Sequence, residues 1–297
     1  MLKRIVLAVL LAALGTPAGA QEKLKVVATF SILADVVKNV GGERVAVTAL
    51  VGPNSDAHVY QPTPTDAKTL SEARVVFVNG LGFEGWMERL IKASGTKAAM
   101  VVASKDVKPR NLDKPDAHGH QHGTDPHAWQ SVGNIKLYVA NVRDALVAAD
   151  PAGKGAYEAN AAAYLTRLDA LDAEIKAAVG KIPADRRKII TTHDAFGYFA
   201  AAYGVAFIAP QGVSTESEVS AKDVAKIITQ IKRQKIPAVF LENVTDDRLL
   251  KRIAAESGAK VGGTLYSDAL TDEKGAAPTY LDMIRHNIKQ LSEALAS

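Results

Sequence analysis

Residues 152–179 form the longest helical pattern in this chain and constrain its fold more than any other feature. The stretch is rich in alanine, and its large apolar residues recur at helical spacings: Tyr157, Tyr164, Leu168, Leu171 and Ile175. At 1.5 Å per residue, about 28 residues form a helix roughly 40 Å long, which is as long as a small domain is wide. Because the stretch lies between two similar patterns, we expect a rigid connector helix over residues 151–182.

On both sides of this helix, short β-branched runs alternate with amphipathic helical segments. Strands are expected at residues 24–29, 45–51, 74–79 and 98–103 in the first half, and at 188–192, 205–209, 238–242 and 260–265 in the second. Such alternation predicts an α/β fold with mostly parallel sheets flanked by helices. We therefore expect two α/β lobes, residues 21–150 and 183–297, joined by the connector.

Residues 1–20 have the pattern of a cleavable secretory signal peptide. Lys3 and Arg4 precede an apolar run over residues 5–14, and the small residues of the cleavage site end at Ala20. The apolar run is shorter than the roughly 20 residues that span a bilayer. The chain contains no cysteine, so neither a lipid anchor nor a disulfide is expected. We expect cleavage after Ala20 and a protein of the bacterial periplasm without a direct membrane anchor.

The charged residues argue against a nucleic-acid partner. The chain has 36 Lys and Arg against 32 Asp and Glu, and its formal net charge is +4. The basic residues are scattered, without a basic block or interleaved aromatic residues, whereas nucleic-acid interfaces concentrate them.

Histidines concentrate in residues 116–129, which hold four of the seven in the chain. Short histidine-rich tracts are typical of metal binding. His118, His120 and His122 alternate with small or polar residues, and we interpret them as an accessory metal loop, with a solvated loop as the alternative. His127 follows an Asp-Pro turn and precedes Ala-Trp at the edge of a helix, so we predict that it is a fixed ligand.

Four candidate ligands follow predicted strands: His58, His127, His193 and Asp268. In open α/β sheets, ligands bind beyond the carboxyl ends of the strands. Two candidates come from each half, so they would converge if the lobes faced each other. Taken singly, each has a structural alternative as a surface, helix-orienting or turn residue, and only the combination favours a site. Three further residues are candidates for the surroundings of the ligands: Tyr60, Trp129 and Glu242.

The order of four motifs resembles the metal-binding solute-binding proteins of bacterial ABC importers, the zinc/manganese family. The motifs lie at residues 53–62, 125–129, 192–199 and 266–270: Pro-Asn-Ser-Asp-Ala-His-Val-Tyr-Gln-Pro, Asp-Pro-His-Ala-Trp, Thr-His-Asp-Ala-Phe-Gly-Tyr-Phe and Tyr-Ser-Asp-Ala-Leu. The resemblance covers essentially the whole mature chain. It implies two α/β lobes joined by one long helix, with a metal between them. Matched by position, it implies the ligands His58, His127, His193 and Asp268.

The third ligand position separates subgroups of the family that this chain resembles. Zinc members have a histidine there and manganese members tend to have a carboxylate; here the residue is His193. Three imidazoles and one carboxylate also suit tetrahedral Zn²⁺, whereas Mn²⁺ prefers oxygen ligands. Asp268 and its lead-in, residues 263–266, look as much like manganese members. We expect Zn²⁺, with Mn²⁺ or iron as the alternative.

These features predict a monomeric carrier that delivers Zn²⁺ to the membrane permease of an ABC importer. Four protein ligands fill a tetrahedral shell, whereas a catalytic zinc keeps one position open for an activated water. We therefore expect a binding protein and not an enzyme. A metal-dependent hydrolase would require one of the four ligands to be absent, and a structural or adhesion protein would use the metal only for stability.

Overall fold

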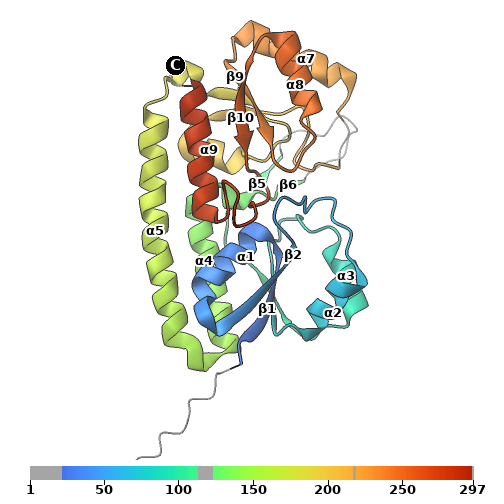
Figure 1. Cartoon of the computed structure of the whole chain (residues 1–297), viewed down its shortest axis with the longest axis vertical. Coiled ribbons are helices and arrows are strands. Elements are labelled where there is room, and N and C mark those ends of the chain that lie inside the picture. Colours follow the sequence, from blue (N-terminus) through green and yellow to red (C-terminus); the bar gives the residue numbers. More distant parts are fainter. Residues whose placement is uncertain (1–21, 113–122, 217–218, 296–297) are drawn as a thin grey trace, which may run out of the picture.

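The protein consists of two α/β lobes stacked along one long helix. The structure, a computed structural model, describes residues 22–112, 123–216 and 219–295. Each lobe contains a parallel four-stranded sheet flanked by helices, and α5 (Lys154–Gly180) runs beside both lobes (Figure 1). The predicted fold class is therefore confirmed.

The N-terminal lobe has the strand order β2-β1-β3-β4, with every pair parallel. Its strands are β1 (Leu24–Phe30), β2 (Val45–Val51), β3 (Val75–Val78) and β4 (Ala99–Val102), and its helices are α1 (Ser31–Gly41), α2 (Pro64–Glu72) and α3 (Met87–Ser94). The start of α2 follows from local chemistry, because Thr63 and Asp66 form a reciprocal capping box around Pro64. Residues 52–63, which include His58, lie between β2 and this fixed helix start.

The C-terminal lobe repeats the arrangement with the strand order β10-β9-β7-β8. Its strands are β7 (Lys188–Ile190), β8 (Ala206–Ile208), β9 (Ala238–Glu242) and β10 (Lys260–Leu265), and its helices are α6 (Gly197–Tyr203), α7 (Ala221–Gln234), α8 (Arg248–Ser257) and α9 (Tyr280–Leu295). In both lobes the loops beyond the carboxyl ends of the strands face the other lobe (Figure 1).

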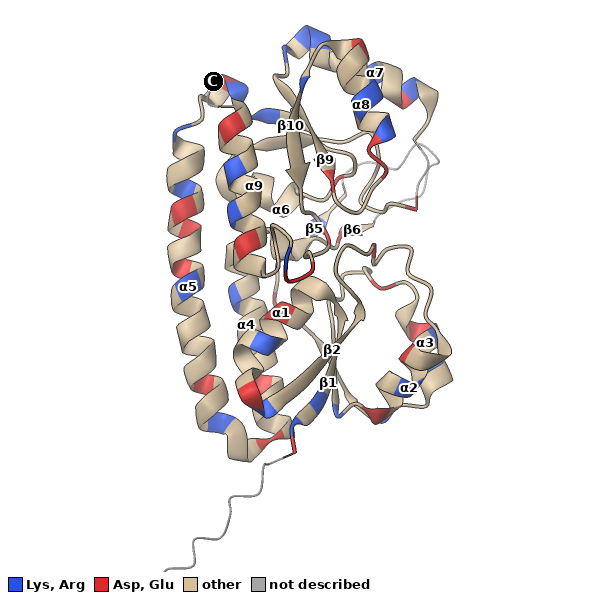
Figure 2. Cartoon of the chain, viewed as in Figure 1, with Lys and Arg blue, Asp and Glu red and all other residues tan. Residues whose placement is uncertain are grey.

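Three long helices line one side of the molecule: α4 (Val132–Ala149), α5 and α9. The predicted apolar positions of α5, from Tyr157 to Ile175, are at most 2% exposed. They pack against α1 and α4 in one lobe and against α9 in the other. Charged residues of both signs lie along α5 and α9 (Figure 2), and one pair joins the two helices through Arg285 and Glu174. This packing fits a connector that restricts large movements between the lobes.

A short antiparallel hairpin, β5 (Arg110–Asn111) with β6 (Thr124–Asp125), was not expected from the sequence. It brings His127 to the space between the lobes, just before a single 3-10 turn over Ala128–Gln130. The accessory loop with His118, His120 and His122 joins the two strands and lies outside the described residues. Three further 3-10 turns occur at Gly42–Arg44, Pro151–Gly153 and Ala184–Arg186.

The predicted signal peptide, residues 1–20, also lies outside the described residues. Within the ranges that the structure describes, no helix has both the length and the apolar character that a membrane span requires.

Candidate metal centre

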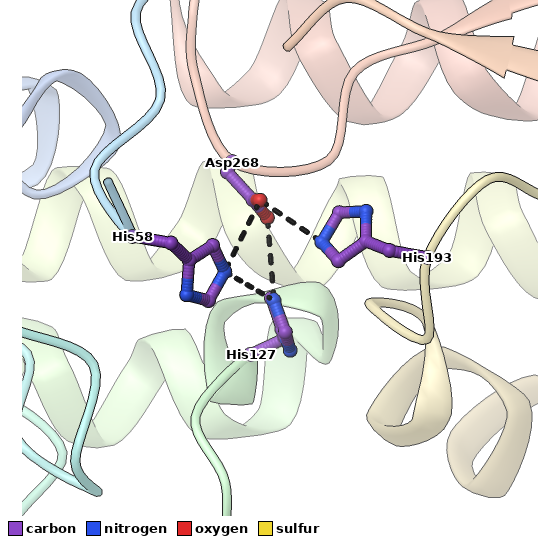
Figure 3. Close-up of side chains that lie close together, drawn as sticks. All are labelled: His58, His127, His193 and Asp268. Carbon is purple, nitrogen blue, oxygen red and sulfur yellow. Dashed lines mark hydrogen bonds and ion pairs between the residues drawn. The ribbon is translucent and has the colours of Figure 1, made fainter. Parts of the chain in front are cut away.

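His58, His127, His193 and Asp268 converge between the two lobes (Figure 3). One nitrogen or oxygen of each lies within 4.8 Å of those of the other three. His58 and His127 come from the N-terminal lobe, after β2 and β6. His193 and Asp268 come from the C-terminal lobe, after β7 and β10. The structure thus brings together all four predicted residues: His58, His193 and Asp268 follow strands of the two parallel sheets. His127, which was expected after the strand at residues 98–103, instead follows the short hairpin strand β6.

The Nε2 atoms of the three imidazoles surround the Asp268 carboxylate. Oδ2 of Asp268 lies 3.0 Å from His193 and 3.5 Å from His58, and Oδ1 lies 3.5 Å from His127. The Nε2 atoms of His58 and His127 are 3.3 Å apart. A tetrahedral zinc shell with bonds of about 2.0–2.1 Å has neighbouring donor atoms about 3.3 Å apart. These four separations fit donors that share one ion.

Burial makes this cluster costly without a cation. The side chains of His127, His193 and Asp268 are fully buried, and that of His58 is 5% exposed. Both oxygens of Asp268 and the Nε2 atom of His193, which faces the cluster, lack a well-aligned hydrogen bond within the described ranges. Buried polar atoms of this kind are normally satisfied, and a bound cation would satisfy them together. The donor set therefore fits a divalent transition metal.

Two buried carboxylates fix the orientation of two of these imidazoles. Nδ1 of His127 lies 2.9 Å from Asp125, and Nδ1 of His193 lies 2.5 Å from Oε2 of Glu242. The other oxygen of Glu242 accepts the backbone N–H groups of Thr192 and His193. A carboxylate on Nδ1 holds the proton there and leaves the lone pair of Nε2 free for a metal. The predicted position of Glu242 beside the ligands agrees with this contact.

The imidazole of His58 is held in another way. Its backbone N–H donates to Oδ1 of Asp56 at 2.8 Å, and its ring packs edge-on against Phe83. It also lines a cavity of about 1230 Å³, together with Phe83 and Trp86. His58 is thus the member of the cluster that borders open space.

Trp129 lies directly beside the cluster, whereas Tyr60 lines the cavity that His58 borders and packs against Trp86. The Trp129 ring packs against His127 with centroids 5.2 Å apart, and its Nε1 donates to the carbonyl of Ser267. The hydroxyl of Tyr60 donates to Asp66 at the start of α2. His286 also lies apart from the cluster, since its Nε2 is 2.9 Å from the carbonyl oxygen of Thr264.

Sequence reasoning missed the roles of Asp56 and Asp125. Each lies two residues before a histidine of the cluster and accepts the backbone N–H of that histidine, at 2.8 Å for His58 and 3.0 Å for His127. Aspartate side chains commonly bond the backbone two residues further on. The repeated Asp-x-His spacing was the signal that could have identified both residues.

In the metal-free cluster, interactions between neighbouring charges keep His193 protonated and Asp268 ionised. Burial lowers the pKa of His193, but the carboxylates of Glu242 and Asp268 outweigh burial and hold it well above its usual range. Burial raises the pKa of Asp268, but His193 and His127 outweigh burial and hold it well below its usual range. The cluster without metal therefore holds an imidazolium where a metal would carry the positive charge.

The family described as "ZnuA: Zinc-uptake complex component A periplasmic" matches residues 26–294, which is nearly the whole described chain. This chain belongs to that family. Its members are periplasmic metal-binding components of ABC importers, so the resemblance seen in the sequence is confirmed.

Individual relatives in the ZnuA family span almost the full length of the chain. The manganese-binding lipoprotein MntA of Halalkalibacterium halodurans is 36% identical over 93% of this chain and 89% of its own length. The iron-binding protein YfeA of Yersinia pestis is 34% identical over 93% and 88%. Among solved structures, the periplasmic zinc binding protein TroA from Treponema pallidum superposes with a TM-score of 0.86, at 33% identity over 93% of this chain and 100% of that chain.

The ZnuA family consists of substrate-binding proteins, so the prediction that this chain is not an enzyme is confirmed and the hydrolase alternative is wrong. The names of the relatives support metal binding, and the cluster of three histidines and one aspartate in this chain agrees with it. Most of the matched relatives whose names give a metal are manganese-binding proteins, whereas YfeA is named for iron and TroA for zinc, so zinc specificity is not confirmed. The choice of metal therefore depends on the chemistry of this chain.

Proposed function

We propose that this chain carries Zn²⁺ through the periplasm to the permease of an ABC importer, with His58, His127, His193 and Asp268 as the ligands. One observation carries the proposal: three Nε2 atoms surround a buried carboxylate that has no well-aligned hydrogen bond of its own. Three imidazoles and one carboxylate match the donors that zinc prefers. Four protein ligands hold the ion without an open catalytic position.

Manganese is the second candidate, and a specific feature of Asp268 favours it. Both carboxylate oxygens face histidine nitrogens, Oδ2 toward His58 and His193 and Oδ1 toward His127. Two-oxygen binding by Asp268 would raise the coordination number above four, and Mn²⁺ suits a larger shell with more oxygen. The name of the manganese-binding relative MntA supports the same candidate, and that of YfeA supports iron.

Metal titrations of the protein, combined with growth of a strain that lacks it, test whether zinc or manganese is the cargo. A site of nitrogen and oxygen donors binds Zn²⁺ more tightly than Mn²⁺ on intrinsic grounds, so simple affinity does not identify the cargo. The protein is stripped with a chelator and titrated with each metal. A strain lacking the protein is then grown under zinc limitation and under manganese limitation. Tight one-to-one zinc binding with growth loss only under zinc limitation supports zinc. Growth loss only under manganese limitation makes manganese the cargo.

We further propose that His118, His120 and His122 gather metal for the main site. The loop that holds them leaves the hairpin at Leu112 and returns at Gly123, where the Leu112 N–H donates to the Gly123 carbonyl at 3.1 Å. A short Gly-Ser turn can therefore replace the loop without moving His127. Uptake at low zinc supply is expected to slow while the affinity of the main site stays unchanged. Unchanged uptake would remove the accessory role.

The remaining proposals concern export, domains and assembly. We propose that the signal peptide is cleaved after Ala20, that residues 21–150 and 183–297 act as the two lobes around connector 151–182, and that the carrier is a monomer without a membrane anchor. Intact mass of the exported protein tests the cleavage site. Light scattering with and without metal tests the monomer, and release into the soluble periplasmic fraction tests the lack of an anchor.

A further inference from the structure

His58 differs from the other two histidines in how it is held. His127 and His193 have the carboxylates of Asp125 and Glu242 at Nδ1. Within the described ranges, no carboxylate lies within ion-pair distance of Nδ1 of His58. Its position depends instead on its backbone N–H, which donates to Oδ1 of Asp56 at 2.8 Å. Whatever holds Asp56 therefore also holds His58.

Asp56 is held from the opposite lobe. Its other oxygen, Oδ2, accepts a hydrogen bond of 2.6 Å from the hydroxyl of Thr215, which lies 159 positions further along the chain, in the segment after β8. A second bond joins the same loop to the C-terminal lobe, from the Asn54 N–H to the Leu270 carbonyl at 2.8 Å. The loop that holds His58 is thus hydrogen-bonded to the C-terminal lobe at two points.

Thr215 is connected in turn to the segment that holds His193. The carbonyl of Thr215 accepts a bond of 2.7 Å from Nε2 of Gln211. Gln211 forms an isolated parallel bridge with His193, and its N–H donates to the Thr192 carbonyl at 3.3 Å. A continuous chain of contacts therefore links the histidine at the end of β7 to the histidine after β2.

We propose that the Thr215–Asp56 hydrogen bond is an interlobe latch that holds His58 on the metal and sets the rate of metal release. The proposal rests on the proposed function, because it requires His58 to be a ligand. His58 is the most exposed member of the cluster and borders the large cavity, so it is the ligand best placed to leave first. Thr215 is then a positioning residue that acts through Asp56.

A latch of this kind acts on release more than on capture. The hydrogen bond is formed in the arrangement in which the four ligand atoms converge, and it fixes His58 there through Asp56. Removing the bond allows His58 to leave the metal more easily, whereas the other three ligands, which the ion can still meet first, are unaffected. A bond from a hydroxyl to a carboxylate is strong enough to change a rate about tenfold.

The test measures zinc transfer from the loaded full-length protein to a coloured chelator by stopped flow. Thr215→Val keeps the side-chain shape and removes the hydroxyl, and we expect release about tenfold faster with an unchanged association rate. Thr215→Ser restores the hydroxyl and should restore the slow rate. Thr229→Val is the matched control, because the Thr229 hydroxyl donates to the Ala225 carbonyl within α7. If valine disturbs the loop, Thr215→Ala replaces it as the test variant, and we expect the same faster release.

A double variant separates the latch from the ligand assignment. If Thr215 acts through His58, Thr215→Val should not accelerate release further in a His58→Ala background. Equal acceleration in both backgrounds, or a wild-type release rate in Thr215→Val, would overturn the latch. If His58→Ala alone leaves zinc affinity unchanged, the ligand set of the proposed function is wrong, which is a separate result.

Discussion

Glu242 at the end of β9 lies against His193 at the end of β7, with Oε2 2.5 Å from Nδ1, although the two residues are 49 positions apart. Its other oxygen accepts the backbone N–H of His193 at 2.9 Å, so one carboxylate holds both the ring and the main chain. The two side chains are fully buried. Glu242 therefore determines the tautomer of His193 and the direction of its Nε2 atom.

Replacing Glu242 with glutamine is expected to weaken zinc binding about 10- to 100-fold, as is usual when the outer partner of a metal-bound histidine is lost. The amide keeps the shape of the side chain but removes the negative charge that makes the imidazole a stronger donor. Competition with a chelator of known affinity measures the loss. Glu158→Gln, on the exposed face of α5, is the control and should bind like the wild type. Equal affinities for the two variants would show that Glu242 does not tune His193.

His193 and His58 should differ in their contribution to the stability of the metal-free protein. His193→Ala leaves the buried carboxylates of Glu242 and Asp268 without their positive partner, which costs about 3 kcal/mol of unfolding free energy. His58→Ala removes a side chain that borders a cavity and has no carboxylate at Nδ1, so we expect a loss below about 1 kcal/mol. Urea unfolding of both variants in a chelator measures this. If both variants lost the same unfolding free energy, the unpaired buried carboxylates could not be the cause of the loss in His193→Ala.

Much of the fold could be predicted because its signals are local. β2 and β10 have the predicted bounds, and the apolar spacing of residues 152–179 corresponds to the buried face of α5. The hairpin of β5 and β6 could not be predicted in this way. Each strand has only two residues, and twelve residues separate them, so neither strand shows a periodicity of its own.

The candidate site was predictable only in part. The type of a residue and its place after a strand can be read from the nearby sequence, whereas contacts between the two lobes cannot. His193 and Asp268 could be selected since each follows a predicted strand. The bond between Asp56 and Thr215 joins two ordinary loop residues 159 positions apart, and no pattern in the sequence relates them. Sequence reasoning could thus suggest four ligands and a place for Glu242 beside them, but not the bond between the lobes that holds Asp56.

Zinc binding should release a proton near neutral pH. The carboxylates of Glu242 and Asp268 outweigh burial and hold the pKa of His193 well above its usual range, so the metal-free protein carries an imidazolium there. A metal must displace that proton, and affinity should therefore rise with pH by about tenfold per unit until His193 deprotonates. The lowered pKa of Asp268 means that this carboxylate is already ionised and releases none. Calorimetry in buffers of different ionisation enthalpy counts the protons. A count of zero would exclude a protonated His193.

The raised pKa of Asp35 predicts a second effect of pH, which concerns the stability of the protein and not metal binding. This α1 residue accepts the Tyr280 N–H at the start of α9, at 3.0 Å, and burial raises its pKa from 3.8 to about 6. The folded protein then binds a proton more tightly than the unfolded chain, so stability falls as pH rises from about 4 to 6 and stays lower above that. The full shift corresponds to about 3 kcal/mol, which partial exposure reduces to on the order of 1–2 kcal/mol.

Asp35→Asn keeps an acceptor for the Tyr280 N–H and removes the titration, so its stability should change less between pH 4 and pH 7 than that of the wild type. Urea unfolding of the metal-free proteins across this range measures the difference. Asp169→Asn, on the outer face of α5 with a side chain 68% exposed, is the control and should follow the wild-type profile. Identical profiles for Asp35→Asn and the wild type would mean that Asp35 titrates alike in the folded and unfolded chains. Burial at the contact between α1 and α9 would then have no effect on its protonation.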